Sequence, residues 1–271
     1  MPAPVTLTDP DDPRFDDFRD LRSAGGRTER DVVTHTVVVE GALAVGRLFT
    51  SRYPVRALLT TPQRAGSVVG VPDSAQVLVA DRALLSEVCG FDVHRGVLAS
   101  ADRLPEEALE QVTDAPRLAV VEGVGDHENL GALFRTAAAL GVGGVLLDSR
   151  CADPLYRRSV RVSLGWSLHV PWCRVGPLPH VLGNLADAGF RTVALTPTSG
   201  ATDVDAAAGA GVLDGRLALV LGAEGPGLSD GTLAAAHHRV RVPMAGDVDS
   251  LNVATAFGVV AAFAAARAGW A

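Results

Sequence analysis

The chain has 271 residues, with 24 cationic side chains against 31 acidic ones and a formal net charge of −7. Every cation is an arginine, which excludes chemistry that needs an amine side chain, such as a Schiff base or the lysine of a phosphate-binding loop. The acidic balance argues against non-specific coating of nucleic acid, because such binding depends on summed positive charge.

The cysteines and the apolar runs indicate the compartment. Cys89, Cys151 and Cys173 form no CxxC pair, which is typical of a reducing environment. The first residues are acidic and rich in proline, unlike a signal peptide. Apolar runs stay below the roughly 18 residues of a membrane span. We therefore expect a soluble, cytoplasmic protein with no membrane partner.

The first part of the chain predicts an arm and a small α/β domain. Residues 1–30 carry Phe15, Phe18 and Leu21 at helical spacing, which predicts a short amphipathic arm. Strand-like and helical segments then alternate over 31–99, which is the expected substrate-binding domain. The next stretch, 100–116, is polar with prolines at both ends and predicts a linker.

Residues 117–271 predict a second domain with a parallel sheet. Short apolar strands alternate with helices, a pattern typical of a sheet covered on both faces. The expected strands cover 118–124, 143–148, 192–197 and 217–222, and the expected helices cover 129–140, 154–164, 180–189 and 252–267.

The first of three glycine-bearing segments begins after the strand at 118–124. Gly123, Gly125 and Gly131 do not have the spacing of a GxGxxG dinucleotide motif, which disfavours a Rossmann oxidoreductase. Asn129 stands where a helix N-cap is expected, and Arg135 follows on the helix. Taken alone, Asn129 would be an ordinary cap and Arg135 a solvated charge.

Two further segments follow strands in the same domain. In 219–230 a strand runs into a Gly/Pro turn, where Glu224 is an isolated charge among glycines. Such turns at the carboxyl ends of strands bring the backbone close to ligands. In 240–260, Ser250 and Asn252 lie at the start of the last helix, where capping alone would explain them.

Taken together, the three segments carry a specific pattern. NxGxxxR at 129–135, GxEGxGL at 222–228 and VPMxGxxxSLN at 242–252 resemble the SpoU-type family of RNA 2′-O-ribose methyltransferases, in the SPOUT superfamily. The resemblance covers roughly 117–268. It implies an α/β fold in which a C-terminal parallel-sheet domain is tied in a trefoil knot, made by the last strand and helix passing through the loop region near 195–226.

The resemblance has mild departures and a weaker N-terminal part. His127, Val242 and Asp247 stand where the family more often has proline, isoleucine and glycine. The stretch 31–99 resembles, in texture and position, the ribosomal-protein-like RNA-binding domain that precedes the catalytic domain in many members.

The family pattern assigns roles to individual residues. It implies S-adenosylmethionine as cofactor, RNA (rRNA or tRNA) as partner, a homodimer, and no metal. The implied cofactor contacts are Leu195, Gly222, Val242 and Leu251. The implied active-site residues are Asn129, Arg135, Glu224, Ser250 and Asn252. The segment RxSxG at 161–165 matches a further family segment, so Arg161, with Arg157 and Arg158, is a candidate ligand of RNA phosphates.

The role of Arg135 has two interpretations. Family proposals make it the general base that deprotonates the ribose hydroxyl, yet arginine stays protonated at ordinary pH. Alternatively, Arg135 holds the phosphate beside the target ribose and polarises the hydroxyl. A rival function is a catalytically silent RNA-binding or ribosome-assembly protein, which the complete motif set disfavours.

Arginines are concentrated in one stretch. Residues 150–174 contain five arginines and one aspartate, so the acidic total does not exclude RNA. The planar guanidinium can bind phosphate through two parallel hydrogen bonds. We therefore expect a local arginine patch near the cofactor site.

Overall fold

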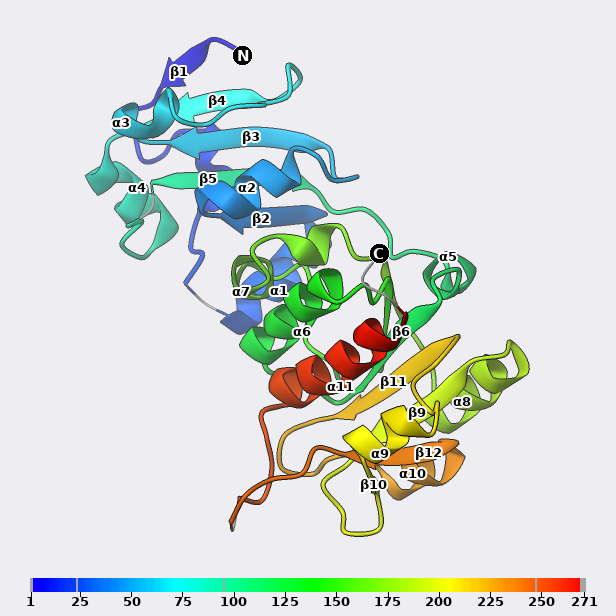
Figure 1. Cartoon of the computed structure of the whole chain (residues 1–271). Helices are drawn as coiled ribbons and strands as arrows, with labels where there is room; N and C mark the ends of the chain where they lie inside the picture. Colours follow the sequence, from blue (N-terminus) through cyan, green and yellow to red (C-terminus); the bar gives the residue numbers. More distant parts are fainter. Residues whose placement is uncertain (1, 23, 95, 247, 269–271) are drawn as a thin grey trace. The chain divides into compact units, whose positions relative to one another are not determined.

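A computed structural model describes residues 2–22, 24–94, 96–246 and 248–268. The chain divides into two compact units (Figure 1). The first unit contains residues 1–105 together with 153–169, and the second contains 106–152 together with 170–271. The segment 153–169, predicted as part of the second domain, therefore folds with the first unit.

The first unit is built on a five-stranded mixed sheet. Its strands are β1 (Pro4–Thr6), β2 (Thr36–Glu40), β3 (Val55–Thr60), β4 (Gln76–Val79) and β5 (Val97–Asp102). Their order is β1-β4-β3-β5-β2, with β5 antiparallel to both of its neighbours. The helices are η1 (Pro13–Phe18), α1 (Ala24–Val33), α2 (Ala42–Leu48), α3 (Pro62–Ala65), α4 (Arg82–Cys89), α7 (Arg157–Val162) and η2 (Trp166–Leu168).

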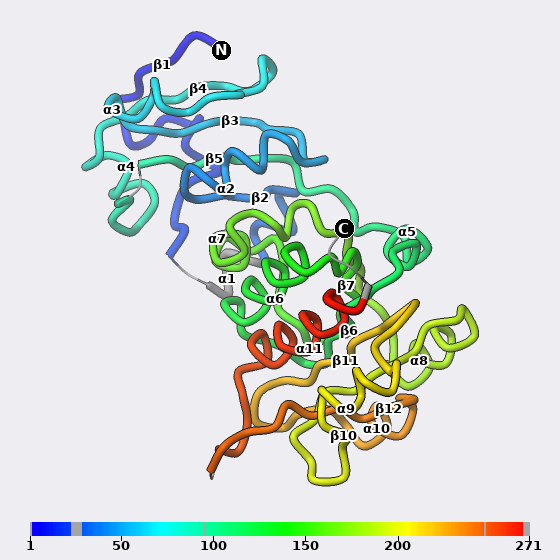
Figure 2. The backbone as a smooth tube through the Cα atoms, viewed as in Figure 1, coloured from blue at the N-terminus to red at the C-terminus, as the bar shows by residue number. Residues whose placement is uncertain are grey.

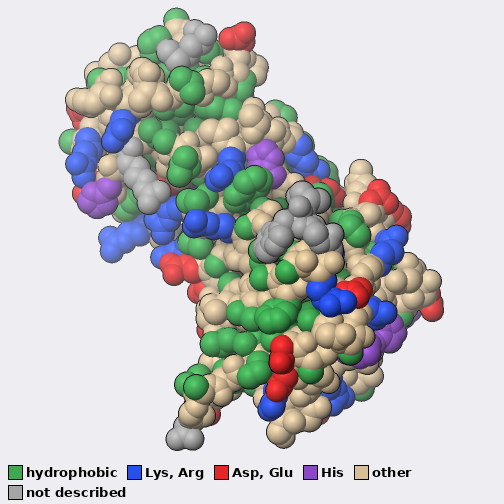
Figure 3. All heavy atoms as spheres, in the orientation of Figure 1, with side chains coloured by type: hydrophobic (Ala, Val, Ile, Leu, Met, Phe, Trp, Pro, Cys, Tyr) green, Lys and Arg blue, Asp and Glu red, His purple; other side chains and the backbone are tan. Residues whose placement is uncertain are grey.

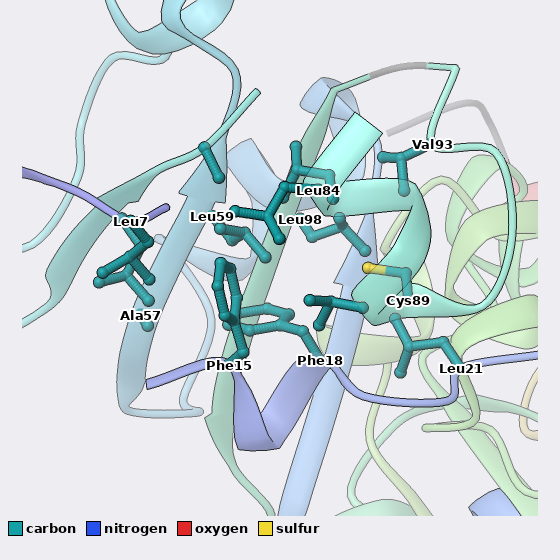
Figure 4. Packing of buried hydrophobic residues seen from close by; sticks show 14 of the residues in the cluster. Leu7, Phe15, Phe18, Leu21, Ala57, Leu59, Leu84, Cys89, Val93 and Leu98 are labelled. Carbon is teal, nitrogen blue, oxygen red and sulfur yellow. The ribbon is translucent and has the colours of Figure 1, made fainter. Parts of the chain in front are cut away.

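The N-terminal segment is part of this unit. Phe15, Phe18 and Leu21 are fully buried and pack with Leu59 and Leu98 of the sheet (Figure 4). The preceding strand β1 pairs in parallel with β4. The segment predicted as an N-terminal arm therefore packs into the first unit, a contact that helical spacing does not reveal, because it shows an apolar face but not the surface that covers it.

The segment 153–169 is attached to the first unit by ion pairs and close packing. Arg103 donates two hydrogen bonds to the carboxylate of Asp153, at 2.8 and 3.0 Å, and both side chains are largely buried. Gly165 approaches α2 so closely that a Cβ atom there would lie 3.1 Å from the Cα atom of Ala44. The tight contact, together with a φ of 87° at Gly165, favours glycine at this position.

The second unit is built on a seven-stranded sheet in which every pair is parallel. Its strands are β6 (Arg117–Glu122), β7 (Gly144–Leu147), β8 (Trp172–Arg174), β9 (Arg191–Leu195), β10 (Thr202–Asp203), β11 (Leu217–Gly222) and β12 (His238–Arg241). Their order is β10-β12-β9-β11-β6-β7-β8. The helices are α5 (Leu109–Thr113), α6 (His127–Ala139), α8 (Leu178–Asp187), α9 (Val204–Gly209), α10 (Asp230–Ala235) and α11 (Val253–Ala268).

Helices cover both faces of this sheet. Leu118 and Val120 of β6 pack in a buried cluster with Leu182 of α8. Ala119 and Val121 are also fully buried, and alternation along the strand points them to the opposite face. The helices α6 and α11 pack against one another (Figure 2). The predicted α/β fold with a parallel-sheet core is confirmed.

Some short elements were not predicted. The expected linker 100–116 contains the end of β5 and the whole of α5, and Glu106 accepts a hydrogen bond from the backbone N–H of Arg174 at 2.7 Å. Proline at both ends of a polar stretch predicts a break in regular structure, but such a stretch can still be held by contacts. Among the described helices, none combines the length and apolar character needed to cross a membrane.

We predict that Arg103→Ala destabilises the protein by about 3 kcal/mol, because it leaves the buried carboxylate of Asp153 without its partner. Equilibrium urea unfolding followed by circular dichroism measures the change. The matched control is Asp214→Asn, which breaks the exposed ion pair with Arg267 and should change stability far less. Equal effects of the two variants would contradict this assignment.

Candidate active site

A cavity of about 440 Å³ lies at the carboxyl ends of β9, β11 and β12 in the second unit. Its walls come from the segments that follow these strands and from the start of α11, and it has the volume of a small-molecule pocket. Open parallel sheets commonly bind ligands at this edge, because the loops there are free to turn over the strand ends.

The structure places the predicted cofactor contacts in one place. Leu195, Gly222, Val242 and Leu251 all line this cavity. Glu224 and Ser250, two of the predicted active-site residues, line it as well. Residues near 195, near 222 and within 240–256, which are distant in the sequence, therefore meet around one volume.

The loop after β11 forms one wall and depends on its glycines. A Cβ atom at Gly222 would lie 2.3 Å from the carbonyl carbon of Gly227, so no larger residue fits without moving the loop. The backbone N–H of Gly227 donates to the carbonyl oxygen of Ala223 at 2.9 Å. Gly225 and Gly227 have positive φ angles of 87° and 68°. The tight turn holds Glu224 at the edge of the cavity.

Asn252 joins three segments of the site through one side chain. Its Oδ1 accepts hydrogen bonds from the backbone N–H groups of Ala254 and Thr255, at 3.0 and 3.2 Å, and so caps α11. Its Nδ2 donates to Oδ1 of Asn129 and to Oε1 of Glu224, both at 2.7 Å. Capping and assembly of the site are therefore two functions of the same amide.

Asn129 lies inside α6 and is not its cap. The N-cap is Asp126, whose carboxylate accepts from the backbone N–H groups of Glu128 and Asn129 at 3.0 and 2.8 Å. The interpretation of Asn129 as the N-cap is wrong, because an aspartate three residues earlier performs this function. The Asn129 side chain is instead available to Asn252.

Arg135 and Ser250 are the less constrained members of the predicted set. Arg135 lies on α6 and is exposed, and its side chain makes no hydrogen bond or ion pair with any residue that the structure describes. Ser250 is exposed at the cavity just before Asn252. Three of the five predicted residues are thus joined directly by hydrogen bonds, and these two are not.

Comparison with known proteins shows the family of this chain. The family model described as the SpoU rRNA Methylase family matches residues 116–262. A protein of Mycobacterium tuberculosis, named as an uncharacterized tRNA/rRNA methyltransferase, is 46% identical over 257 residues, which cover 92% of this chain and 88% of that protein. The chain belongs to the SpoU rRNA methylase family.

Other SpoU relatives have more specific names. A Burkholderia 23S rRNA (guanosine-2′-O-)-methyltransferase, RlmB, is 33% identical over 193 residues, covering 69% of this chain and 75% of that protein. A solved RNA 2′-O ribose methyltransferase has a TM-score of 0.78 at 25% identity, covering 98% of this chain and 99% of that one. The SpoU methyltransferase AviRb from Streptomyces viridochromogenes, solved with AdoMet, has a TM-score of 0.79 at 23% identity and covers 95% and 99% of the two chains.

The three arginines predicted to contact RNA phosphates belong to the first unit of this SpoU protein, whereas the cavity belongs to the second. Arg157 forms an ion pair with Glu40, and its guanidinium stacks over the ring of Phe91 at 4.5 Å. This internal use argues against Arg157 as a phosphate ligand. Arg161 lies 3.7 Å from the same carboxylate and is half-buried, and Arg158 is exposed.

Sequence reasoning missed a group of charged residues beside the site of this SpoU protein. Glu122 and Asp148 follow the apolar runs of β6 and β7 and are buried, and both form ion pairs with Arg150. Burial opposes ionisation of Asp148, but hydrogen bonds from Gly123, Cys151 and Arg150 outweigh it and lower the pKa of the carboxyl. The sequence signal that could have found this group is an acidic residue directly after each of these two apolar runs.

The cysteines of this SpoU protein are buried. Burial, and to a smaller extent a hydrogen bond with Asp148, raises the pKa of Cys151 to about 12. Burial, and to a smaller extent repulsion from the carboxylate of Glu106, raises the pKa of Cys173 to about 11. These thiols are not poised as nucleophiles. Within the described ranges, no group of three or more His, Cys, Asp or Glu residues could hold a metal ion.

We therefore predict that the native protein resists alkylation at about pH 8, because all three thiols are buried and the raised pKa values of Cys151 and Cys173 suppress their thiolate forms. Iodoacetamide labelling followed by intact-mass measurement should show almost no modification. The same protein unfolded in guanidinium should take up label at all three cysteines. Rapid labelling of Cys151 in the native state would show that this thiol is accessible and ionised.

Proposed function

We propose that this chain is an S-adenosylmethionine-dependent methyltransferase that transfers a methyl group to a ribose 2′-hydroxyl of rRNA or tRNA. The observation that carries the proposal is the junction at Asn252, which joins Asn129 and Glu224 and so brings all three family motifs together. The cavity beside it is lined by residues of the second and third motifs. The names of the Burkholderia RlmB and of the solved 2′-O ribose methyltransferase support the ribose as the target.

The cavity has the chemistry to hold the cofactor. Leu195, Val242, Met244 and Leu251 supply apolar surface suited to an adenine ring, and backbone groups of the loops around them supply polar contacts. Glu224 is an anion at the edge of the cavity, where it would attract the positive charge of a sulfonium. Bound S-adenosylmethionine supplies an activated methyl group.

The protein's own residues then position the nucleophile. Because Oδ1 of Asn129 and Oε1 of Glu224 are held by Asn252, the Asn129 amide N–H groups and Oε2 of Glu224 are left to orient ribose hydroxyls. Holding two reactants in line supplies a large part of the rate enhancement in such transfers. Arg135, exposed and unpaired among the described residues, would hold the neighbouring phosphate and polarise the 2′-hydroxyl.

The same proposal includes a homodimer and the family's knot. α11 carries a single charged residue, Arg267, and its exposed surface includes Phe263 at 37% exposure. Hydrophobic side chains gather over this helix on the face that Figure 3 shows. A second copy of the chain is the proposed cover for this surface. For the knot, the support is β12, which pairs with β9 and β10 in the interior of the sheet before the chain continues into α11.

We expect isothermal calorimetry to detect binding of S-adenosylmethionine, and Gly222→Ala to weaken it at least about 10-fold, because the added Cβ displaces the cavity wall. Gly183→Ala in α8 is the matched control, since a Cβ atom there would have no other atom within 4 Å. Absence of binding by the unaltered protein would favour the silent RNA-binding alternative.

We expect Arg135→Ala to reduce methyl transfer on the order of 100-fold or more while leaving cofactor affinity unchanged, because it removes substrate positioning only. RNA from a strain lacking the gene serves as substrate, and the product is mapped by resistance to alkaline hydrolysis, which 2′-O-methylation confers and base methylation does not. Arg216→Ala, an exposed arginine at the amino end of β11, is the control. Near-normal transfer by Arg135→Ala would contradict both roles considered for this residue.

A further inference from the structure

Glu122, Arg150 and Asp148 form a bridged ion pair at the carboxyl ends of β6 and β7. Nε of Arg150 donates to Oδ2 of Asp148 at 2.9 Å, and Nη2 donates to Oε1 of Glu122 at 3.3 Å. The carboxylate side chains are 8% and 11% exposed, whereas that of Arg150 is 67% exposed. One exposed guanidinium therefore bridges two nearly buried carboxylates and offsets part of their charge.

Each carboxylate also holds the backbone of a loop that enters the candidate site. Oδ1 of Asp148 accepts from the N–H of Gly123 at 3.0 Å, at the start of the segment that leads into α6 and Asn129. Oε2 of Glu122 accepts from the N–H of Ser229 at 3.0 Å. Ser229 ends the glycine loop that carries Glu224.

The two loops meet at Gly123. A Cβ atom there would lie 3.6 Å from the guanidinium carbon of Arg150 and 3.8 Å from Cβ of Ala223, the residue before Glu224. Gly123 itself has a φ of 68°, which favours glycine. Arg150 and the glycine loop therefore both approach this backbone turn where a Cβ atom of residue 123 would lie.

We propose that Glu122, Arg150 and Asp148 are positioning residues, which hold the loops bearing Asn129 and Glu224 at the separation that their shared contact with Asn252 requires. The inference rests on the proposed methyl transfer, which it deepens. These roles explain why two acids are kept nearly buried beside the site. Each carboxylate accepts a hydrogen bond from the backbone of one site loop, and the guanidinium between them reduces their mutual repulsion.

The alternative role for Arg150 is that of an RNA phosphate ligand. The local charge argues against it, because two carboxylates and one guanidinium leave a net negative charge. The two roles differ kinetically. A positioning residue acts on the rate of transfer from the bound complex, whereas a phosphate ligand acts mainly on the KM for RNA.

The test compares Arg150→Ala, Arg150→Lys and Glu122→Gln with the control Asp214→Asn, which breaks an exposed ion pair elsewhere in the second unit. Amide hydrogen exchange is measured on the protein alone, and kcat and KM are measured with RNA from a strain lacking the gene. In Arg150→Ala we expect faster exchange confined to 122–129 and 222–229, a kcat lower by about 10- to 100-fold, and a KM for RNA unchanged within about 2-fold.

The remaining variants sharpen the result. Arg150→Lys should recover part of kcat, because an ammonium restores the single positive charge but cannot bridge both carboxylates with fixed geometry. Glu122→Gln keeps an acceptor for Ser229 but turns an amide N–H toward Arg150, so it should loosen 222–229 more than 122–129. Unchanged exchange in both loops, or a raised KM with normal kcat, would overturn the inference. If the unaltered protein transfers no methyl group, the proposed function fails, and the exchange data still decide whether the loops are held.

Discussion

The candidate site depends on the side-chain amide of Asn252. Its oxygen satisfies the first N–H groups of α11, and its nitrogen satisfies the oxygens of Asn129 and Glu224. Helix termini leave such N–H groups without partners, so a capping residue is required whatever the protein does. Here the same residue carries two more hydrogen bonds to α6 and to the loop after β11. Folding of the last helix and assembly of the site are therefore coupled.

Around that amide, the backbone of the glycine loop and the ion pair at Arg150 fix the remaining geometry. Gly222 allows the loop to fold back against Gly227, which places Glu224 within reach of Asn252. The opposite end of the loop is held by Glu122 through Ser229. A short loop tied at both ends loses little entropy when a ligand binds, which is the usual condition for a preorganised site.

A count of arginines along the chain does not show which of them can contact RNA, because several form internal ion pairs and hydrogen bonds. Arg103 and Arg157 form ion pairs with buried carboxylates of the first unit, and Arg174 donates to three backbone carbonyls, those of Asp148, Cys151 and Ala152. Within the arginine-rich stretch 150–174, Arg157 and Arg174 therefore have structural contacts, and the stretch is divided between the two units. Arg135, by contrast, is the single arginine of α6, the helix that carries Asn129, and it is exposed.

The sequence alone determined the class of fold, the positions of the longer strands and helices, and the family, because hydrophobic periodicity and motif spacing are local properties of the chain. It also predicted Asn129, Glu224 and Asn252 as members of one site, although it could not show that one amide joins them. The tertiary structure decided what depends on contacts between distant segments. Phe15 and Phe18 proved to be core, the segment 153–169 folded with the first unit, and Asp126 replaced Asn129 as the cap. The ion pair of Glu122, Asp148 and Arg150 belongs to the same category, because its members meet only when parallel strands bring their carboxyl ends to one edge of the sheet.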